Sequence, residues 1–78
     1  MIFLIEYNRD AGVICGITQF TDSARQEAED RRLHVEVANL RAGVSREVVL
    51  LEAASEADLR RTHRRYFESL ADIAKVEM

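Results

Sequence analysis

The sequence predicts an α+β fold in which two strands, a helix, a third strand and a second helix follow one another along one domain, residues 1–78. Short apolar segments of strand length occur at 1–7, 13–20 and 48–51, and turn or helix signals separate them. A serine is twice followed, three residues later, by an acidic or amide side chain, which is the signature of a helix start. No proline interrupts these segments, and a chain of this length is typical of a single domain.

The first two strands are predicted to form a hairpin. Residues 2–5 are all apolar, which is typical of a strand covered on both faces, so we place the strand 1–7 at the centre of the sheet. The segment 8–12 has the Asn, Asp and Gly residues of a turn, and its short length predicts antiparallel pairing with the strand 13–20. Gly16 inside that strand indicates a β-bulge or a close approach of another backbone segment.

The first helix is predicted to begin at Ser23, because Ser23 and Gln26 match a capping box, and to end near Leu40, ahead of Gly43. Its apolar residues lie on two sides of the helix. One side carries Ala24, Ala28, Val35 and Ala38, and the opposite side carries Leu33, Val37 and Leu40. A helix that is apolar on two sides contacts two surfaces. We expect one surface to be the sheet and the other to be the second helix or a partner chain.

The third strand and the second helix lie in the segment 46–67. Residues 48–51 are apolar without alternation and begin with two β-branched valines, which predicts a buried strand. Ser55 and Asp58 then match a second capping box, so the helix is expected to begin at Ser55. The residues predicted to share its apolar face are Leu59, Thr62, His63, Tyr66, Phe67, Leu70, Ile73 and Ala74.

Two strand orders are compatible with these elements. Placing the most apolar strand at the centre gives the order 2-1-3, a split β-α-β arrangement in which the second and third strands are parallel to each other. The order 1-2-3 would leave the apolar first strand at an edge, where it invites aggregation. We therefore predict a three-stranded mixed sheet of order 2-1-3 with both helices packed on one face.

An uncovered sheet face is the basis of the predicted function. The strands 1–7 and 48–51 are apolar on both sides, so a sheet covered on one face exposes an apolar patch, which usually marks an interface. A chain with a single cysteine also has no internal disulfide to stabilise a small core. We predict a homodimer, formed through the open face or through the edge of the second or third strand, that acts as a protein–protein interaction module.

Net charge and hydropathy disfavour several other classes of protein. A net charge of −3 disfavours binding of the whole chain to nucleic acid or to an anionic membrane. No apolar segment approaches the length of a membrane span, and the N-terminus lacks the basic leader and the cleavage site of a signal peptide. We expect an intracellular, cytoplasmic protein with no membrane association.

The strongest local signal is a basic cluster in the second predicted helix, formed by Arg60, Arg61, Arg64 and Arg65. Clustered guanidinium groups contact phosphates, and aromatic side chains beside them are typical of RNA-binding proteins. Ion pairs on a solvated helix face explain the same residues more simply, and the negative total charge favours that interpretation. Binding of RNA or of a phosphate ligand through these arginines is the alternative function.

A pocket formed by His63, Glu6 and Glu52 is a third hypothesis. In the order 2-1-3 the two glutamates lie on neighbouring strands, within expected reach of His63. Together these side chains would line a ligand or acid–base pocket. The simpler interpretation is a neutral histidine packed in the core and two glutamates that mark the ends of strands.

No catalytic or metal-binding motif is recognisable in the chain. The three glycines are too far apart for a phosphate-binding loop, and two histidines without a ligand spacing do not predict a zinc site. Cys15 lies in a strand without basic neighbours, so we expect it to pack as a small apolar residue, and we expect His34 near the surface. We predict no catalytic residue, no metal and no cofactor, and we favour a non-enzymatic protein.

Overall fold

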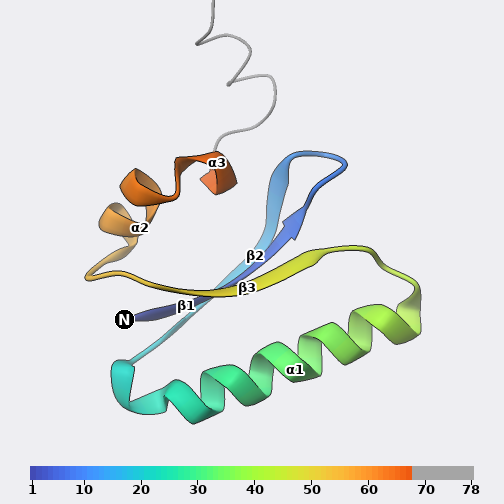
Figure 1. Ribbon diagram of the computed structural model, residues 1–78, viewed down its shortest axis with the longest axis horizontal. Helices are drawn as coiled ribbons and strands as arrows, with labels where there is room; N and C mark the ends of the chain where they lie inside the picture. The colour runs from blue at the N-terminus through green and yellow to red at the C-terminus, as the bar shows by residue number, and fades with distance from the viewer. Residues whose placement is uncertain (68–78) are drawn as a thin grey trace, which may run out of the picture.

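Figure 1 shows the computed structural model of the chain, which describes residues 1–67. The elements in order are strand β1 (Ile2–Asn8), strand β2 (Val13–Phe20), a 3-10 turn η1 (Asp22–Ala24), helix α1 (Arg25–Ala42), strand β3 (Glu47–Glu52), and the short helices α2 (Glu56–Thr62) and α3 (Arg64–Phe67). The predicted order of strands and helices is confirmed, except that two short helices stand where one longer helix was expected.

The strands of the described region form one open sheet of order β2-β1-β3. This is the order predicted from the apolar character of β1, and it confirms the α+β class. β1 runs antiparallel to both of its neighbours. The prediction of a mixed sheet is corrected on this point: β2 and β3 run in the same direction, but β1 separates them, so both hydrogen-bonded pairs are antiparallel.

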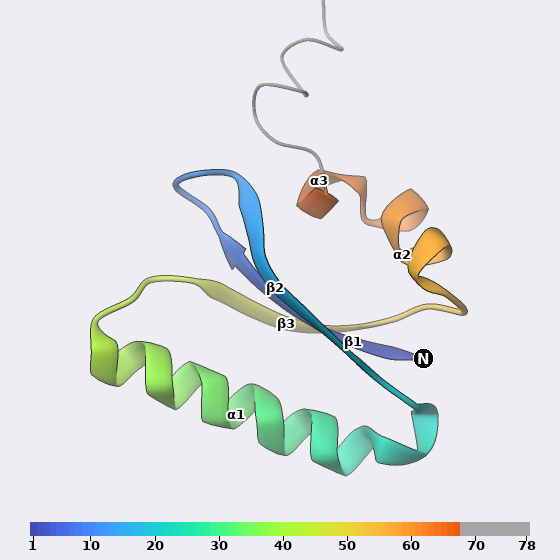
Figure 2. The ribbon, with the colours of Figure 1, turned by 180° about the vertical axis from the view of Figure 1, so that it is seen from behind.

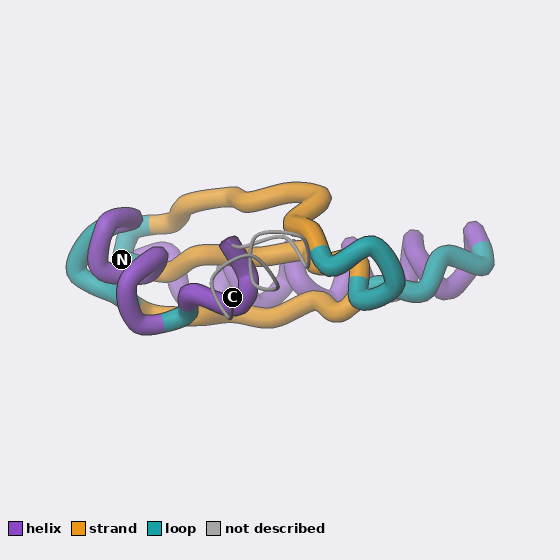
Figure 3. The backbone as a smooth tube through the Cα atoms, turned by 90° about the horizontal axis from the view of Figure 1, so that it is seen from above, coloured by secondary structure: helices purple, strands orange, loops and turns teal. Residues whose placement is uncertain are grey.

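The helices lie on opposite faces of the sheet, and the prediction that both pack on one face is wrong. In Figures 1 and 3, α1 runs along one side of the strands, whereas α2 and α3 lie on the other side. Phe3 and Ile5 pack with Leu59 of α2. Because side chains alternate along a strand, Ile2 and Leu4 point to the opposite face, where they are also buried.

Covering both faces removes the exposed apolar sheet face on which the dimer prediction was based. On the α2 side, partly buried apolar side chains among the described residues enclose the core. They belong to Met1, Tyr7, Ile14, Val49, Leu51, Ala53, Tyr66 and Phe67. On the α1 side, Ala28 is fully buried, and Ala24 and Val35 are partly buried. A strand that is apolar on both faces is stabilised only when both faces leave water, and the chain supplies a helix for each.

A bulge in β2 lies beside the end of β1. Glu6 pairs with Gly16 and Tyr7 pairs with Ile14, so Cys15 is the extra residue. A Cβ atom at Gly16 would lie 3.1 Å from Oε2 of Glu6, which shows that the glycine also accommodates a close approach. The predicted bulge is therefore confirmed, whereas the group that approaches Gly16 closely is the side chain of Glu6 and not the backbone. Cys15 is exposed, contrary to the expectation that it packs as an apolar residue, because the bulge takes it out of the regular alternation.

The helix ends follow the capping signals in two of three cases. Ser55 caps α2 as predicted, since its Oγ accepts a hydrogen bond of 3.1 Å from the backbone N–H of Asp58. Gly43 ends α1 with a φ of 70°, a left-handed conformation that glycine adopts without strain. The predicted start at Ser23 is shifted, because Ser23 lies in η1 and α1 begins at Arg25.

The helix that begins after Ser55 is interrupted at His63. The backbone of this residue has φ −122° and ψ 49°, which is outside the helical region, and α3 starts at the next residue. The bend turns Tyr66 and Phe67 back onto the sheet, where they enclose the core. The predicted apolar-face residues Leu70, Ile73 and Ala74 lie outside the described residues.

The molecule is flat, with extents of 43 × 33 × 11 Å. The shortest dimension runs across the three strands, so each broad side of the molecule presents one edge strand of the sheet. This strand is β3 in Figure 1 and β2 in the reversed view of Figure 2. The helices described here flank the faces of the sheet and leave both edges uncovered. Within residues 1–67, no helix combines the length and the apolar composition needed to cross a membrane.

The Ser55 cap gives a direct test of the fold. Ser55→Ala removes the acceptor for an otherwise unpaired amide of α2, and we expect the free energy of unfolding to fall by about 1 kcal/mol. Urea unfolding followed by circular dichroism measures the change. Ser45→Ala is the matched control, because Ser45 is exposed in the connection between α1 and β3, and it should change stability by less than about 0.5 kcal/mol. Equal effects of the two substitutions would contradict the assigned cap.

Candidate functional site

A cleft of about 460 Å³ opens where the end of β1, the start of β3 and helix α3 meet. Its lining residues are Tyr7, Arg9, Glu47, Arg65 and Tyr66. They come from three segments that are far apart in the sequence. The cleft is therefore a product of the tertiary fold, and we take it as the candidate site.

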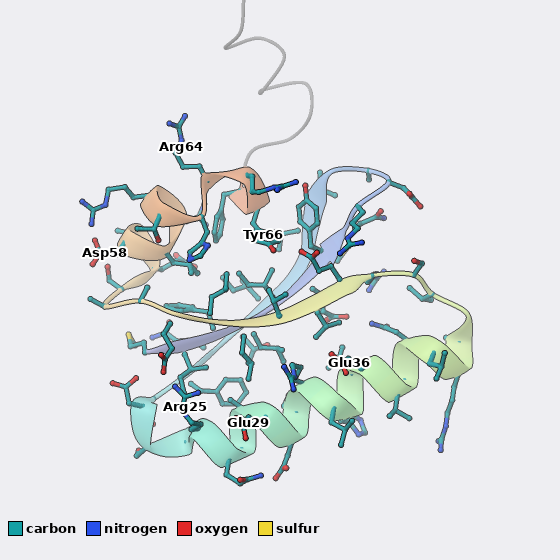
Figure 4. The ribbon with its side chains drawn as sticks, in the orientation of Figure 1. Arg25, Glu29, Glu36, Asp58, Arg64 and Tyr66 are labelled. Carbon is teal, nitrogen blue, oxygen red and sulfur yellow. The ribbon has the colours of Figure 1, made fainter. Side chains whose placement is uncertain are left out.

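Strand register and the bend at His63 bring these residues together. Tyr7 of β1 and Glu47 of β3 are paired across the strands, so both side chains project from the face that α3 covers. The bend directs Tyr66 toward the sheet (Figure 4). The rings of Tyr66 and Tyr7 meet edge to face, with centroids 5.1 Å apart and planes at 88°, which is a favoured geometry for aromatic pairs.

Glu47 is the centre of the polar network in the cleft. The hydroxyl of Tyr66 donates a 2.6 Å hydrogen bond to Oε2 of Glu47. Nε and Nη2 of Arg9 donate to the other oxygen, Oε1, at 3.2 and 2.5 Å. Both carboxylate oxygens are therefore engaged, and only 22% of the Glu47 side chain is exposed. The network fixes the positions of one aromatic and one basic side chain.

These contacts shift the pKa of each partner in the direction that favours the network at neutral pH. The hydrogen bond from Tyr66, followed by that from Arg9, lowers the pKa of Glu47, although partial burial acts in the opposite direction. The hydrogen bond to Glu47 raises the pKa of the Tyr66 hydroxyl, and burial adds to this effect. Glu47 is thus an ionised acceptor and Tyr66 a protonated donor over a wide range of pH.

Arg65 adds a second positive charge to the cleft. Its charge lowers the pKa of both Glu47 and Tyr66. In the part of the chain that the structure describes, its guanidinium group makes no ion pair within 4.0 Å, whereas Arg9 is paired with Glu47. The cleft therefore holds two guanidinium groups and one carboxylate, which leaves an excess of positive charge.

The predicted basic cluster is divided by the fold. Nε of Arg60 lies 3.8 Å from Oε2 of Glu56, and its guanidinium group lies over the ring of Phe67 at 4.6 Å from the centroid. Nη2 of Arg61 forms a 2.9 Å ion pair with Asp58. The pair of Arg61 with Asp58 is one that the simpler interpretation of the cluster expected, and the pair of Arg60 with Glu56 is a further one of the same kind.

The other two arginines of the cluster belong to α3 and point in different directions. Arg64 points away from the sheet (Figure 4), whereas Arg65 lines the cleft. The physical reason is that adjacent residues of a helix project in different directions, and the break at His63 separates both residues from Arg60 and Arg61 of α2. Arg65 is the one predicted site residue that the structure places in the cleft.

The residues of the hypothetical pocket lie on opposite faces of the sheet. His63 ends α2, on the face covered by α2 and α3. Glu6 and Glu52 project from the α1 face. There, Oε1 of Glu6 lies 3.6 Å from Nη1 of Arg46, and Glu52 forms an ion pair with Arg25. The structure therefore does not bring His63 together with either glutamate, because alternation along the strands turns both carboxylates away from it.

Tyr7, Arg9, Glu47 and Tyr66 were not identified as site residues from the sequence. Tyr7 ends the first predicted strand, Glu47 lies directly before the third, and Arg9 lies in the predicted turn. Their proximity depends on the register of β1 with β3, for which the sequence offers no local signal. His34 is exposed as expected. In residues 1–67, no three His, Cys, Asp or Glu side chains lie close enough together to hold a metal ion.

The role of Tyr66 in the network is testable through the pKa of Glu47. Tyr66→Phe removes the hydrogen bond that lowers this pKa most, and we expect the pKa to move up toward its ordinary value near 4.5. When the pKa of Glu47 is lower in the folded than in the unfolded protein, the carboxylate stabilises the fold at any pH above its unfolded pKa. This stabilisation is lost as the pH falls through the folded pKa. The variant should therefore be less stable than the wild type at neutral pH, and its free energy of unfolding should fall less as the pH drops below the unfolded pKa of Glu47.

Carboxyl carbon NMR titration of Glu47 and acid unfolding measure the two effects. Tyr7→Phe is the matched control, because it keeps the aromatic pair and leaves both donors to Glu47 in place. A Glu47 pKa that is the same in Tyr66→Phe and wild type, or that shifts equally in the two variants, would show that the Tyr66 hydrogen bond does not control this carboxylate.

Similarity to other proteins does not assign a role to the cleft. No protein-family model, curated protein or solved structure matches the chain. The role of the site is therefore inferred from its own chemistry: one ionised carboxylate, two guanidinium groups and two tyrosine rings at the junction of β1, β3 and α3.

Proposed function

We propose that the protein is a self-associating module that acts through protein–protein contact, with the outer side of α1 as its contact surface. We call this surface the outer stripe and define it by Leu33, Val37 and Leu40. These side chains are 60%, 37% and 81% exposed. The exposure of Leu40 and Leu33 on one line of a helix is the observation that carries the proposal.

The outer stripe lies nearly opposite the side of α1 that packs on the sheet. Ala28 on the inner side is fully buried. At 3.6 residues per turn, Leu33, Val37 and Leu40 project from the opposite side of the helix. Single exposed apolar residues are normal on a protein surface. Three of them at positions i, i+4 and i+7 form a continuous apolar strip, which is the pattern of a helix that packs against a partner.

A second copy of the chain is the partner that fits the stripe best. In an antiparallel pair of α1 helices related by a two-fold axis, Leu33 faces Leu40 of the partner subunit, and Val37 faces Val37 of the partner subunit. Asp30 and Arg41 both flank the stripe on one side. In this pair, Asp30 comes near Arg41 of the partner subunit, and the reverse contact forms by symmetry.

The same geometry limits the strength of the dimer. Glu36 flanks the stripe on its other side and comes close to Glu36 of the partner subunit, so that flank contributes repulsion. One pair of helices of this length also buries less surface than a typical stable interface of roughly 1,600 Å². We therefore expect a dissociation constant in the micromolar range, around 10⁻⁵ to 10⁻⁴ M.

Polar substitution of the stripe tests the proposal. Leu33→Ser combined with Leu40→Ser removes four apolar side chains from the symmetric contact, and we expect the dimer to weaken by about tenfold or more. Sedimentation velocity over protein concentrations from about 10 μM to 1 mM measures the dissociation constant in the range set above. Both residues are exposed, so circular dichroism should show an unchanged fold.

Val13→Ser combined with Ile17→Ser is the matched control. These side chains of β2 are 40% and 38% exposed, so the control removes apolar surface from a different place, beside an uncovered sheet edge. Its dimer should be as strong as that of the wild type. A wild-type protein that stays monomeric at about 1 mM, or a dimer that is lost in the control and kept in the stripe variant, would refute the proposed contact.

The alternative function is binding of RNA or a phosphate ligand through Arg60, Arg61, Arg64 and Arg65. The ion pairs of Arg60 and Arg61 with acidic residues of their own helix count against it, since these acids compete with phosphates. A binding assay with mixed oligonucleotides at increasing salt distinguishes the two functions. Affinity that falls steeply with salt and is lost in Arg61→Ala/Arg64→Ala/Arg65→Ala would favour the alternative.

A further inference from the structure

The cleft at the end of β1 has the composition of a receptor for a small anion. We propose that it binds an oxyanion, the carboxylate or phosphate group of a small organic molecule, between the guanidinium groups of Arg9 and Arg65. This site is independent of the outer stripe, because α3 and α1 lie on opposite faces of the sheet (Figure 1). Ligand binding and self-association can therefore be tested separately.

The first support is that Arg9 is held in position while keeping donors unused. A guanidinium group carries five N–H donors. Arg9 directs Nε and Nη2 to one oxygen of Glu47, so Nη1 and the second hydrogen of Nη2 remain for a ligand. The Glu47 carboxylate thus orients the guanidinium group in advance, which lowers the entropy cost of binding an anion.

The second support is the charge on Arg65. Among the described residues, it lines the cleft without a carboxylate within 4.0 Å, so its guanidinium group is available to a planar oxyanion in a bidentate geometry. Glu47 does not take this role, since its two oxygens already accept from Tyr66 and Arg9. A ligand with one negative charge would balance the two guanidinium groups and the single carboxylate.

The third support is the shape and lining of the cleft. Its volume of about 460 Å³ lies within the range of roughly 300–1,000 Å³ that is typical of small-molecule sites. The edge-to-face pair of Tyr7 and Tyr66 provides a rigid aromatic wall beside the charges. An anion attached to a flat organic body would contact the guanidinium groups and the rings together, so phenyl phosphate and benzoate are suitable probes.

A titration of the full chain tests the proposal. Phenyl phosphate, benzoate and the uncharged phenol are added separately, and amide chemical shifts are followed by two-dimensional NMR. We expect one or both anions to shift the amides of Tyr7, Arg9, Glu47, Arg65 and Tyr66 with saturation, and phenol to bind at least about tenfold more weakly, because it lacks the charge-assisted hydrogen bonds. The stronger of the two anions identifies the preferred group.

Arg65→Ala should weaken binding of the preferred anion by about tenfold or more. Arg61→Ala is the matched control, since it removes the same group from a residue that pairs with Asp58, and it should change the affinity by less than about twofold. Arg65→Lys keeps the charge without the planar fork and should fall between wild type and Arg65→Ala. Amide spectra of each variant without ligand verify the fold.

Three results would overturn the proposal. One is that neither anion shifts the amides of the cleft at millimolar concentration. Another is that phenol binds as well as the anions, which would mean that only the tyrosine rings are recognised. The last is that Arg61→Ala and Arg65→Ala weaken binding equally, which would show a diffuse attraction to the basic helices and no defined site.

Discussion

The rest of the structure depends on one constraint, which is that β1 is apolar on both of its faces. Ile2, Phe3, Leu4 and Ile5 are all buried, and they can leave water only if strands pair with β1 on both edges and helices cover it on both faces. Hydrophobic burial of this kind is the dominant favourable contribution to folding. It explains the central position of β1, and it explains why a short chain places its helices on opposite sides of the sheet.

This division of the helices moves the exposed apolar surface from the sheet to α1. With α2 and α3 on one face, α1 is the element of residues 1–67 that covers the other, and it packs through small side chains such as Ala28. The two leucines of α1, Leu33 and Leu40, remain on its outer side. Self-association therefore remains a proposal, but its basis is different: the proposed contact surface is a helix, and the sheet is covered on both faces.

The candidate cleft follows from the same strand pairing. Register between β1 and β3 places Tyr7 opposite Glu47, and packing of α3 against the covered face brings Tyr66 to the same carboxylate. A partly buried carboxylate is stable when its oxygens accept hydrogen bonds, and here the donors are a tyrosine and an arginine. Glu47 therefore links the fold to the site, because its carboxylate joins β3 to Arg9, in the turn after β1, and to Tyr66 of α3.

Local patterns in the sequence determined the elements and their order across the sheet. The run of apolar residues 2–5 placed β1 at the centre, Ser55 and Gly43 marked helix ends, and the two-sided pattern of α1 indicated apolar residues on a side of the helix away from the sheet. Such features depend on neighbouring residues alone. The tertiary structure decided which helix covers which face, because a strand apolar on both sides does not distinguish them. It also decided the break at His63 and the assembly of the cleft, since these depend on packing between segments that are distant in the chain.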